Sequence, residues 1–392
     1  TSTQMVALNI VYDVGARDEH PEHTGFAHLF EHLMFGGSAH IPDYDTPLQL
    51  AGGENNAWTN NDITNYYLTV PKTNVETAFW LESDRMLELT FSEQGLEVQR
   101  GVVMEEFKQR CLNQPYGDVG HLFRPLAFRV HPYRWPTIGK ELSHIEQATL
   151  DEVKSFFYRF YAPNNAVLAV TGNISWDETV KLTEKWFAPI PRRNVPVRQL
   201  PQEPEQTQER RLTVERNVPL DALFMGYHMC SREGADYYAF DILSDILSNG
   251  RSSRLNRRLV QEQNIFSGID AYISGTRDAG LLQISGKPAA GVSLEQAEAA
   301  VRKELEELQR SPVDGQELEK VKNKFESTQI FGNINYLNVA TNLAWFELTG
   351  KAEDIDLEVE RYRSVTTEQL HTVAQRTFCE SNAVVLYYKS DK

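Results

Sequence analysis

The chain of 392 residues contains only three cysteines, Cys111, Cys230 and Cys379, and no Cys-x-x-Cys pair. An odd number of widely separated cysteines predicts neither a disulfide framework nor a zinc site built from thiolates. The sequence also lacks a run of about 18 uncharged apolar residues, the length that a helix needs to cross a bilayer. We therefore expect no membrane span and no disulfide-stabilised scaffold.

Basic residues are scarce relative to acidic ones, with 39 lysines and arginines against 55 aspartates and glutamates. The resulting net charge of −16 argues against a nucleic-acid-binding protein, because neutralising phosphates requires a basic face. Apolar residues make up 41% and charged residues 24% of the chain, which is typical of a globular protein. At this length, two domains of comparable size are expected.

The most informative stretch is Gly25–Phe35, which contains the pattern His28-x-x-Glu31-His32. On a helix this spacing places the three polar side chains on one face, while apolar side chains cover the rest of the surface. The pattern is the signature of the inverzincin metallopeptidases. Two imidazoles one turn apart can bind one zinc ion, and the glutamate can act as general base on a zinc-bound water. We predict His28 and His32 as metal ligands and Glu31 as the catalytic residue.

A catalytic zinc usually has three protein ligands, so we expect a third ligand, a carboxylate, elsewhere in the chain. Residues 93–112 are predicted to form a long helix that contains two adjacent glutamates, Glu105 and Glu106. Placing the apolar residues of this helix on its buried side leaves one of the two glutamates facing inward. Helical periodicity alone does not separate Glu105 from Glu106.

Two features of the sequence divide the chain. Residues 189–209 are rich in proline and poor in apolar residues, which predicts a semi-extended linker. The stretches Thr149–Val153 and Asn165–Val167 recur as Thr366–Leu370 and Asn382–Val384, both at an offset of about 217 residues. The recurrence predicts a duplication.

We therefore predict a catalytic domain over residues 1–188 and a homologous domain over residues 210–392. The strand-like run 5–12, the hairpin-like runs 57–59 and 64–70 and the helical periodicities between them indicate an α+β fold. We expect each duplicated domain to be a mostly antiparallel β-sheet packed by helices. Overlaying the halves puts Asp241, Ser244 and Asp245 where the first half has its polar triplet, so the second domain is expected to be non-catalytic.

Four motifs occur together and in order: His28–His32, Asn56–Thr59 with Asp62, Gln99–Glu106, and His131–Tyr133. Because it contains these four motifs in this order, the chain resembles the pitrilysin family, which includes insulin-degrading enzyme and the mitochondrial processing peptidase. The resemblance covers most of the chain and is to the shorter, two-domain branch. The complete His-x-x-Glu-His pattern looks like that of a catalytic, beta-type subunit.

The resemblance implies a zinc-dependent metalloendopeptidase that cleaves peptides or unfolded protein segments, with attack by zinc-bound water and Glu31 as general base. The family's distal zinc ligand aligns with Glu106. A supporting glutamate of the family stands seven residues before that ligand, where this chain has Gln99. A hydrogen bond can survive there, but a supporting charge around the metal cannot.

The resemblance also implies how substrate binds. The family adds its substrate as an extra β-strand to an edge strand, and Asn56, Ala57 and Trp58 are the residues that would contact it. The alternative is an ordinary hairpin in which Trp58 packs in a core.

The second half departs from the family at two positions, and this departure bears on which partner subunit the chain needs. Family members grip the substrate with an arginine and a tyrosine, and this chain has Val260 and Ser267 at those positions. We therefore expect dimerisation with a non-catalytic homologous subunit that supplies the missing pair, with a homodimer as the alternative. A non-catalytic structural subunit of the same fold is the alternative function. We expect a soluble protein, in the bacterial cytoplasm or periplasm rather than in a mitochondrion.

Overall fold

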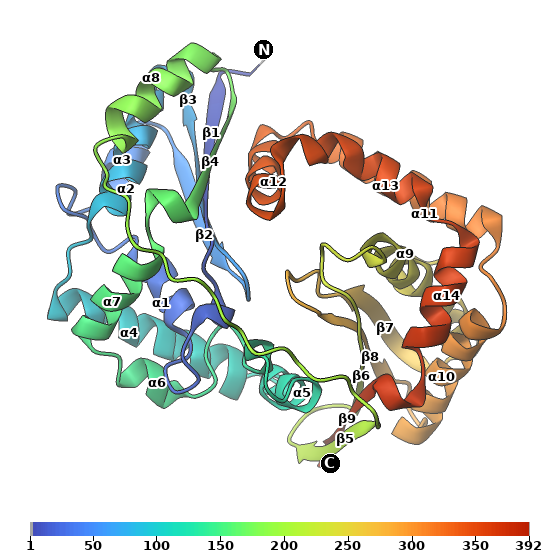
Figure 1. Ribbon diagram of the computed structural model, residues 1–392. Coiled ribbons are helices and arrows are strands. Elements are labelled where there is room, and N and C mark those ends of the chain that lie inside the picture. The colour runs from blue at the N-terminus through green and yellow to red at the C-terminus, as the bar shows by residue number, and fades with distance from the viewer. Residues whose placement is uncertain (1–2, 392) are drawn as a thin grey trace. The chain divides into compact units, whose positions relative to one another are not determined.

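The computed structural model describes residues 3–391 of the chain, which form two compact units (Figure 1). Neither unit is contiguous in sequence. Unit 1 consists of the described residues up to Gln114 together with His131–Gln202 and Phe331–Ile355. Unit 2 consists of Pro115–Val130, Glu203–Ile330 and the described residues from Asp356 onward.

Unit 1 is built on a four-stranded antiparallel sheet in the order β2-β3-β1-β4. The strands are β1 (Met5–Tyr12), β2 (Glu54–Thr59), β3 (Thr64–Pro71) and β4 (Ala166–Gly172). Strand β2 pairs with β3 in a register that puts Ala57 opposite Tyr66, and it lies at the edge of the sheet. One side of β2 is therefore left without a strand partner in the described residues.

Alternation along β1 separates the two faces of this sheet. Val6, Leu8 and Ile10 point into the main core of unit 1 and are fully buried there. The helices of this core are α1 (Phe26–Leu33), α2 (Asp45–Leu50), α3 (Val75–Leu87), α4 (Glu93–Phe107), α6 (Leu142–Glu146), α7 (Leu150–Phe160) and α8 (Trp176–Phe187).

The opposite face of the sheet is covered by α12 (Tyr336–Thr349), which comes from far along the chain (Figure 1). Its small residues Ala340 and Ala344 are one turn apart, and they pack against Val11 of β1 and Ala169 of β4. Small side chains allow the helix backbone to approach the strands closely. The Thr341 hydroxyl donates to Asn9 Oδ1 at 3.2 Å, so the contact is partly polar.

Unit 2 repeats this plan on a five-stranded sheet in the order β5-β9-β6-β8-β7. Its strands are β5 (Arg210–Arg216), β6 (Ala222–His228), β7 (Phe266–Ile273), β8 (Leu281–Pro288) and β9 (Ala383–Ser390). Four of them follow the order of unit 1, with β6 in the central position of β1 and β9 in that of β4. Strand β5 has no counterpart in unit 1 and pairs in parallel with β9.

One face of the second sheet packs against the core helices of unit 2, which are α9 (Tyr237–Ser248), α10 (Leu294–Arg310), α11 (Gly315–Gly332), α13 (Glu358–Ser364) and α14 (Thr367–Thr377). The other face receives α5 (Val119–Ala127), a helix of the first sequence repeat. Phe123 of α5 lies over Gly226 of β6, where a Cβ atom would come within 2.8 Å of the ring. Glycine at this position makes the close packing of the helix possible.

The prediction of an α+β fold with two duplicated domains is confirmed. The observed units differ from the predicted ranges 1–188 and 210–392 because α5 and α12 each pack on the sheet of the other repeat. The proline-rich stretch contains no helix or strand between Pro191 and Glu209, and Arg193 ties it to unit 1 by donating to Leu87 O at 2.7 Å. Across residues 3–391, no helix combines the length and apolar character that a bilayer crossing requires.

Candidate metal centre

Helix α1 is anchored at its start by a carboxylate from the preceding loop. Gly25 precedes the helix with φ of +88°, a conformation that glycine adopts readily. Glycine has no side chain that could cap the helix, and Glu19 takes this role: its Oε2 accepts from Gly25 N and its Oε1 from Ala27 N, both at 2.9 Å. The buried carboxyl group of Glu19 satisfies two backbone donors at this end of the helix.

The two sides of α1 have different environments. Phe26, Leu29 and Phe30 are buried in the core of unit 1. The polar residues His28, Glu31 and His32 lie on the side that faces α4 and β2. Burial of the apolar side therefore fixes which way the polar residues point.

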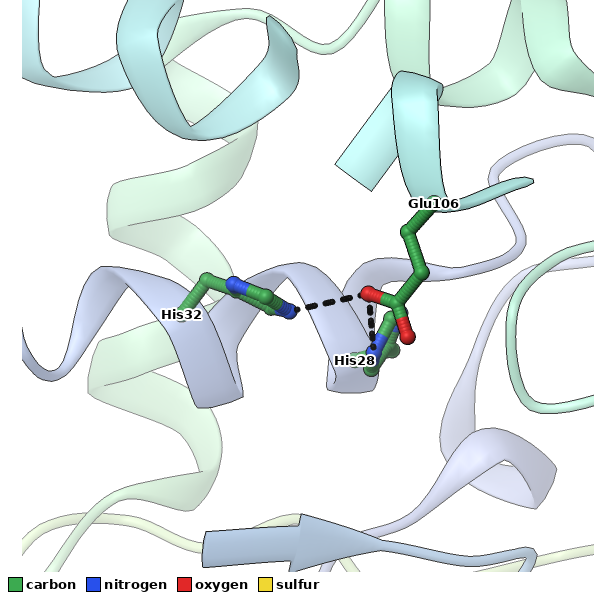
Figure 2. Close-up of side chains that lie close together, drawn as sticks. All are labelled: His28, His32 and Glu106. Carbon is green, nitrogen blue, oxygen red and sulfur yellow. Dashed lines mark ion pairs between the residues drawn. The ribbon is translucent and has the colours of Figure 1, made fainter. Parts of the chain in front are cut away.

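Figure 2 shows His28 and His32 of α1 with Glu106, which reaches them from α4. Glu106 Oε2 lies 3.4 Å from His28 Nε2 and 3.4 Å from His32 Nε2. The two imidazole centroids are 4.9 Å apart and the rings are nearly perpendicular, at 88°. One potential ligand atom from each of the three residues lies within 4.8 Å of the others. The structure thus brings together the three residues predicted to hold the metal.

The ambiguity between the two glutamates of α4 is resolved by their directions. Glu105 is exposed and pairs with Lys108 at 2.6 Å. Glu106 is half-buried and faces the histidines. Of the two, only Glu106 is placed to share an ion with them.

The donor set and its spacing fit a zinc ion. Tetrahedral zinc with ligand bonds of about 2.1 Å separates its ligand atoms by about 3.4 Å, the distance found between the glutamate oxygen and each imidazole nitrogen. Burial, as the main cause, lowers the pKa of His28 to about 4, which keeps its imidazole neutral. The hydrogen bond from His32 is the largest of the influences that lower the pKa of Glu106. Neutral imidazoles and an ionised carboxylate are the forms that bind metal.

Glu31 stands apart from this cluster and is held by a different element. Its Oε2 accepts a hydrogen bond from the Thr59 hydroxyl of β2 at 2.7 Å. Burial, as the main cause, raises the pKa of Glu31, while the bond from Thr59 acts in the opposite direction. The carboxylate therefore lies beside the candidate ligands but is oriented by the edge strand.

The three residues predicted to contact substrate lie on that edge strand. Asn56 is exposed, Ala57 is half-buried, and Trp58 is 36% exposed. Trp58 is thus not part of the core, contrary to the ordinary-hairpin alternative. Asn56 Oδ1 accepts a hydrogen bond from Ala57 N at 2.8 Å, so one backbone donor of β2 is occupied by a neighbouring side chain.

Gln99 lies two turns before Glu106 on α4 and is half-buried near the end of α1. A Cβ atom placed on Gly36 would lie 4.0 Å from its amide nitrogen. Within the described part of the chain its amide makes no hydrogen bond to a candidate ligand. Its predicted supporting role stays a prediction.

Three residues around the site were not singled out by the sequence analysis: Glu19, Thr59 and Arg110. Arg110 Nη2 pairs with Glu106 Oε1 at 2.8 Å, and its four-residue spacing from Glu106 is a signal that the sequence does contain. Glu19 and Thr59 reach α1 through the tertiary fold. Thr59 ends the Asn56–Thr59 motif, but that motif does not indicate a bond to Glu31, and no motif contains Glu19.

Unit 2 has no equivalent centre among the residues that the structure describes, where the only cluster of three or more possible metal ligands is His28, His32 and Glu106. Asp241, Ser244 and Asp245 lie on α9, the helix that follows the central strand β6. The hydroxyl of Tyr362 donates to Asp241 Oδ2, and Asp245 Oδ1 accepts from Asn249 at 2.7 Å. These carboxylates are therefore engaged with neighbouring side chains of unit 2.

Comparison with known families gives two matches. Residues 1–118 match the family described as "Insulinase (Peptidase family M16)". Residues 147–325 match the family described as "Peptidase M16 inactive domain". Together the two profiles account for most of the chain.

Individual relatives agree with these matches. The chain is 26% identical to "Zinc protease PqqE" of Helicobacter pylori, over 99% of this chain and 88% of that protein. It is 25% identical to "Uncharacterized zinc protease YmxG" of Bacillus subtilis, over 98% of this chain and 93% of that protein. The crystal structure of a protease from Helicobacter pylori superposes with a TM-score of 0.92 at 26% identity, covering 99% of this chain and 95% of that one. The fold is therefore shared along nearly the whole chain.

Proposed function

Because the chain belongs to peptidase family M16, we propose that it is a zinc-dependent metalloendopeptidase that cleaves peptides or unfolded protein segments. The observation that carries the proposal is the meeting of His28, His32 and Glu106 at the spacing of a zinc coordination sphere. The relatives named as zinc proteases support the choice of metal.

The three candidate ligands would leave a fourth position for water or substrate, as in catalytic zinc sites. A bound zinc ion would polarise the scissile carbonyl and lower the pKa of a water molecule, so that attack proceeds near neutral pH. His28 and Glu106 arrive from different helices, and their hold on the ion therefore depends on the packing of α1 against α4.

Glu31 is the proposed general base. Its carboxylate is oriented by Thr59 and points to the same side of α1 as the ligands, so it can take the proton of the attacking water. It can then deliver that proton to the nitrogen of the leaving amine, which needs one to depart. Partial burial keeps the carboxylate away from bulk water while it holds the proton.

The edge strand β2 is the proposed substrate-binding element. A peptide that adds to β2 as a further strand gains main-chain hydrogen bonds with little demand on its sequence. Thr59 belongs to this strand and also bonds Glu31, so a peptide paired with β2 would pass beside the general base. Asn56, Ala57 and Trp58 would contact it, and the side chain of Asn56 would have to release Ala57 N.

The proposed partner is a non-catalytic subunit of the same fold that supplies an arginine and a tyrosine missing from this chain. Val260 packs against the core of unit 2, and the Ser267 hydroxyl donates to Lys287 O at 3.1 Å. Neither side chain can replace a cationic or phenolic grip on a peptide. Peptide cleavage by the purified chain, measured alone and after mixing with its co-purifying partner, tests this idea. Equal rates would count against it and favour the homodimer.

The function itself is tested by cleavage of an unfolded protein and of quenched fluorescent peptides by the zinc-loaded chain. Glu31→Gln should retain its zinc and lose hydrolysis by about 100- to 10,000-fold, the usual contribution of general acid–base catalysis. Ser244→Ala, at the position of unit 2 that corresponds to Glu31, is the matched control and should hydrolyse as the wild type does. Full turnover by Glu31→Gln, or no hydrolysis by the wild type with or without its partner, would contradict the proposal.

A further inference from the structure

The metal-facing carboxylate of Glu106 is shared between two sets of neighbours. Oε2 faces the two histidines, and Oε1 pairs with Arg110 Nη2 at 2.8 Å. Arg110 lies on the short π-helical segment η3 (Lys108–Leu112), which continues α4. The carboxylate of Glu106 therefore lies between the guanidinium and the candidate metal position.

The ion pair of Arg110 differs from the neighbouring ion pair of the same helix in what its carboxylate also faces. Lys108 pairs with Glu105 at 2.6 Å at the same end of α4, and neither residue touches the candidate ligands. Two adjacent pairs of the same helix thus differ in direction: one faces the histidines, and the other faces solvent. This difference provides a matched control within a few residues.

Arg110 also keeps most of its hydrogen-bonding capacity. Its side chain is 67% exposed, and Glu106 is its only side-chain partner among the described residues. A guanidinium has five N–H donors in a planar fork, and one ion pair uses a minority of them. The remaining donors are open to a ligand that approaches the centre.

We propose that Arg110 is a specificity-determining residue, which binds a carboxylate of the substrate beside the scissile bond. The inference rests on the proposed peptidase function. A carboxylate matches the fork of a guanidinium in shape and charge, and the pair with Glu106 restricts the side-chain motion that binding would otherwise have to freeze. The acidic chain as a whole, with net charge −16, repels acidic peptides at long range, so this preference acts only within about a Debye length, 8–10 Å.

The carboxylate could come from an aspartate or glutamate side chain of the substrate or from its C-terminus. A set of quenched fluorescent peptides with one cleavable bond separates these sources. In one arm, a single glutamate replaces glutamine at each position near the bond in turn, with the C-terminus amidated. In the other arm, glutamine-only peptides are compared with a free and an amidated C-terminus.

The zinc-loaded wild type should prefer a carboxylate in one of these arms by about tenfold in kcat/KM, as expected for a charge-assisted contact. Arg110→Gln should reduce this ratio to near one, and Arg110→Lys should retain part of it because the charge remains. Lys108→Gln is the control and should keep the wild-type ratio. A wild-type ratio near one in both arms would overturn the inference, as would a ratio that Arg110→Gln leaves unchanged.

A binding measurement separates failure of this inference from failure of the proposed function. The same peptides are titrated by fluorescence anisotropy into zinc-loaded Glu31→Gln, with and without Arg110→Gln. About tenfold tighter binding of the acidic peptide, lost with Arg110 and weakened by added salt, supports the role of Arg110 even if no hydrolysis is found. Equal Kd values for acidic and neutral peptides would overturn it while leaving a peptidase function intact.

Discussion

Helices α1 and α9 hold equivalent places in the two units, since each follows the central strand of its sheet, β1 or β6. On α1, the nitrogen atoms of His28 and His32 converge with an oxygen of Glu106. On α9, Asp241 accepts from Tyr362, and close by Arg232 pairs with Glu358 at 2.6 Å. The first helix presents lone pairs that can take a metal ion, whereas the carboxylates of the second already accept hydrogen bonds from neighbouring side chains.

The comparison teaches that the scaffold alone does not make the centre. Both units have the same order of four strands and a helix over the same face of the sheet. What differs is whether the carboxylates already have partners. In unit 2 the guanidinium of Arg232 pairs with Glu358, and the phenol of Tyr362 donates to Asp241. In unit 1, Arg110 pairs with Glu106 at the rim of the cluster. Function resides in the side chains placed on the fold.

The largest effect is expected from removing a ligand. His32→Ala should weaken zinc binding by more than about 100-fold, because loss even of groups that merely support a ligand costs 10- to 100-fold. Asp245→Ala, at the corresponding place on α9, should leave zinc binding unchanged. Competition with a fluorescent zinc chelator gives both affinities. Similar losses in the two variants would remove the distinction between the helices.

A second effect is a loss of stability without a loss of zinc binding, and it is expected in unit 2. Glu358→Ala removes the carboxylate that pairs with Arg232 and should lower the free energy of unfolding by up to about 3 kcal/mol, as for other buried ion pairs that lose one partner. Glu306→Ala breaks the exposed pair with Arg310 and should cost less than about 1 kcal/mol. Chemical denaturation measures both. Zinc affinity should stay at the wild-type value in each, and a loss of zinc from Glu358→Ala would show that the two units are not independent in this respect.

A third effect concerns the start of α1. Glu19→Ala leaves two buried backbone N–H groups without their acceptor and should cost about 2 kcal/mol of stability. Since the same helix carries two candidate ligands, zinc affinity should fall by about tenfold. Glu22→Ala, in the exposed part of the same loop, should change neither quantity. Unchanged zinc affinity in Glu19→Ala would mean that α4 and the core hold α1 without this cap.

The smallest expected effect is a difference between two buried glutamates, one in each unit, in the pH at which their charge is lost. Burial raises the pKa of Glu19 in unit 1 to about 8. Burial also tends to raise the pKa of Glu298 in unit 2, but hydrogen bonds from Arg211, Tyr387 and Arg302 lower it to about 2. A lowered folded-state pKa stabilises the protein above the unfolded value of 4.5, and this stabilisation is lost as the pH falls from there toward 2.

Acidification from about pH 6 to about pH 3 should therefore cost the wild type about 1 to 2 kcal/mol more than it costs Glu298→Gln. Urea denaturation at the two pH values measures the difference. Equal losses in the two proteins would show that the carboxylate is not held by these donors.

The sequence predicts the parts of this molecule that depend on local spacing. His28, Glu31 and His32 share a helix face because of their three- and four-residue spacing, and the helix forms where expected. The repeat at an offset of about 217 residues predicts two similar sheets, and both are present. The predicted helix over residues 93–112 is α-helical only to Phe107 and then becomes π-helical.

The parts that the sequence does not predict depend on tertiary packing. Periodicity cannot separate Glu105 from Glu106, because adjacent residues differ by only about 100° around a helix, and the position of α1 decides between them. The exchange of α5 and α12 between the repeats leaves no local signal, since the apolar residues of a helix do not show which of two similar sheets it packs on. Thr59 reaches Glu31 only because β2 lies beside α1.

The central claim is that unit 1 holds one zinc ion between His28, His32 and Glu106 while unit 2 holds none. Anomalous diffraction from zinc-loaded crystals, recorded on both sides of the zinc absorption edge, tests it most directly. We expect one peak per chain, about 2.1 Å from the two Nε2 atoms and from a carboxylate oxygen of Glu106. A peak at Asp241 and Asp245, or no peak between α1 and α4, would contradict the account.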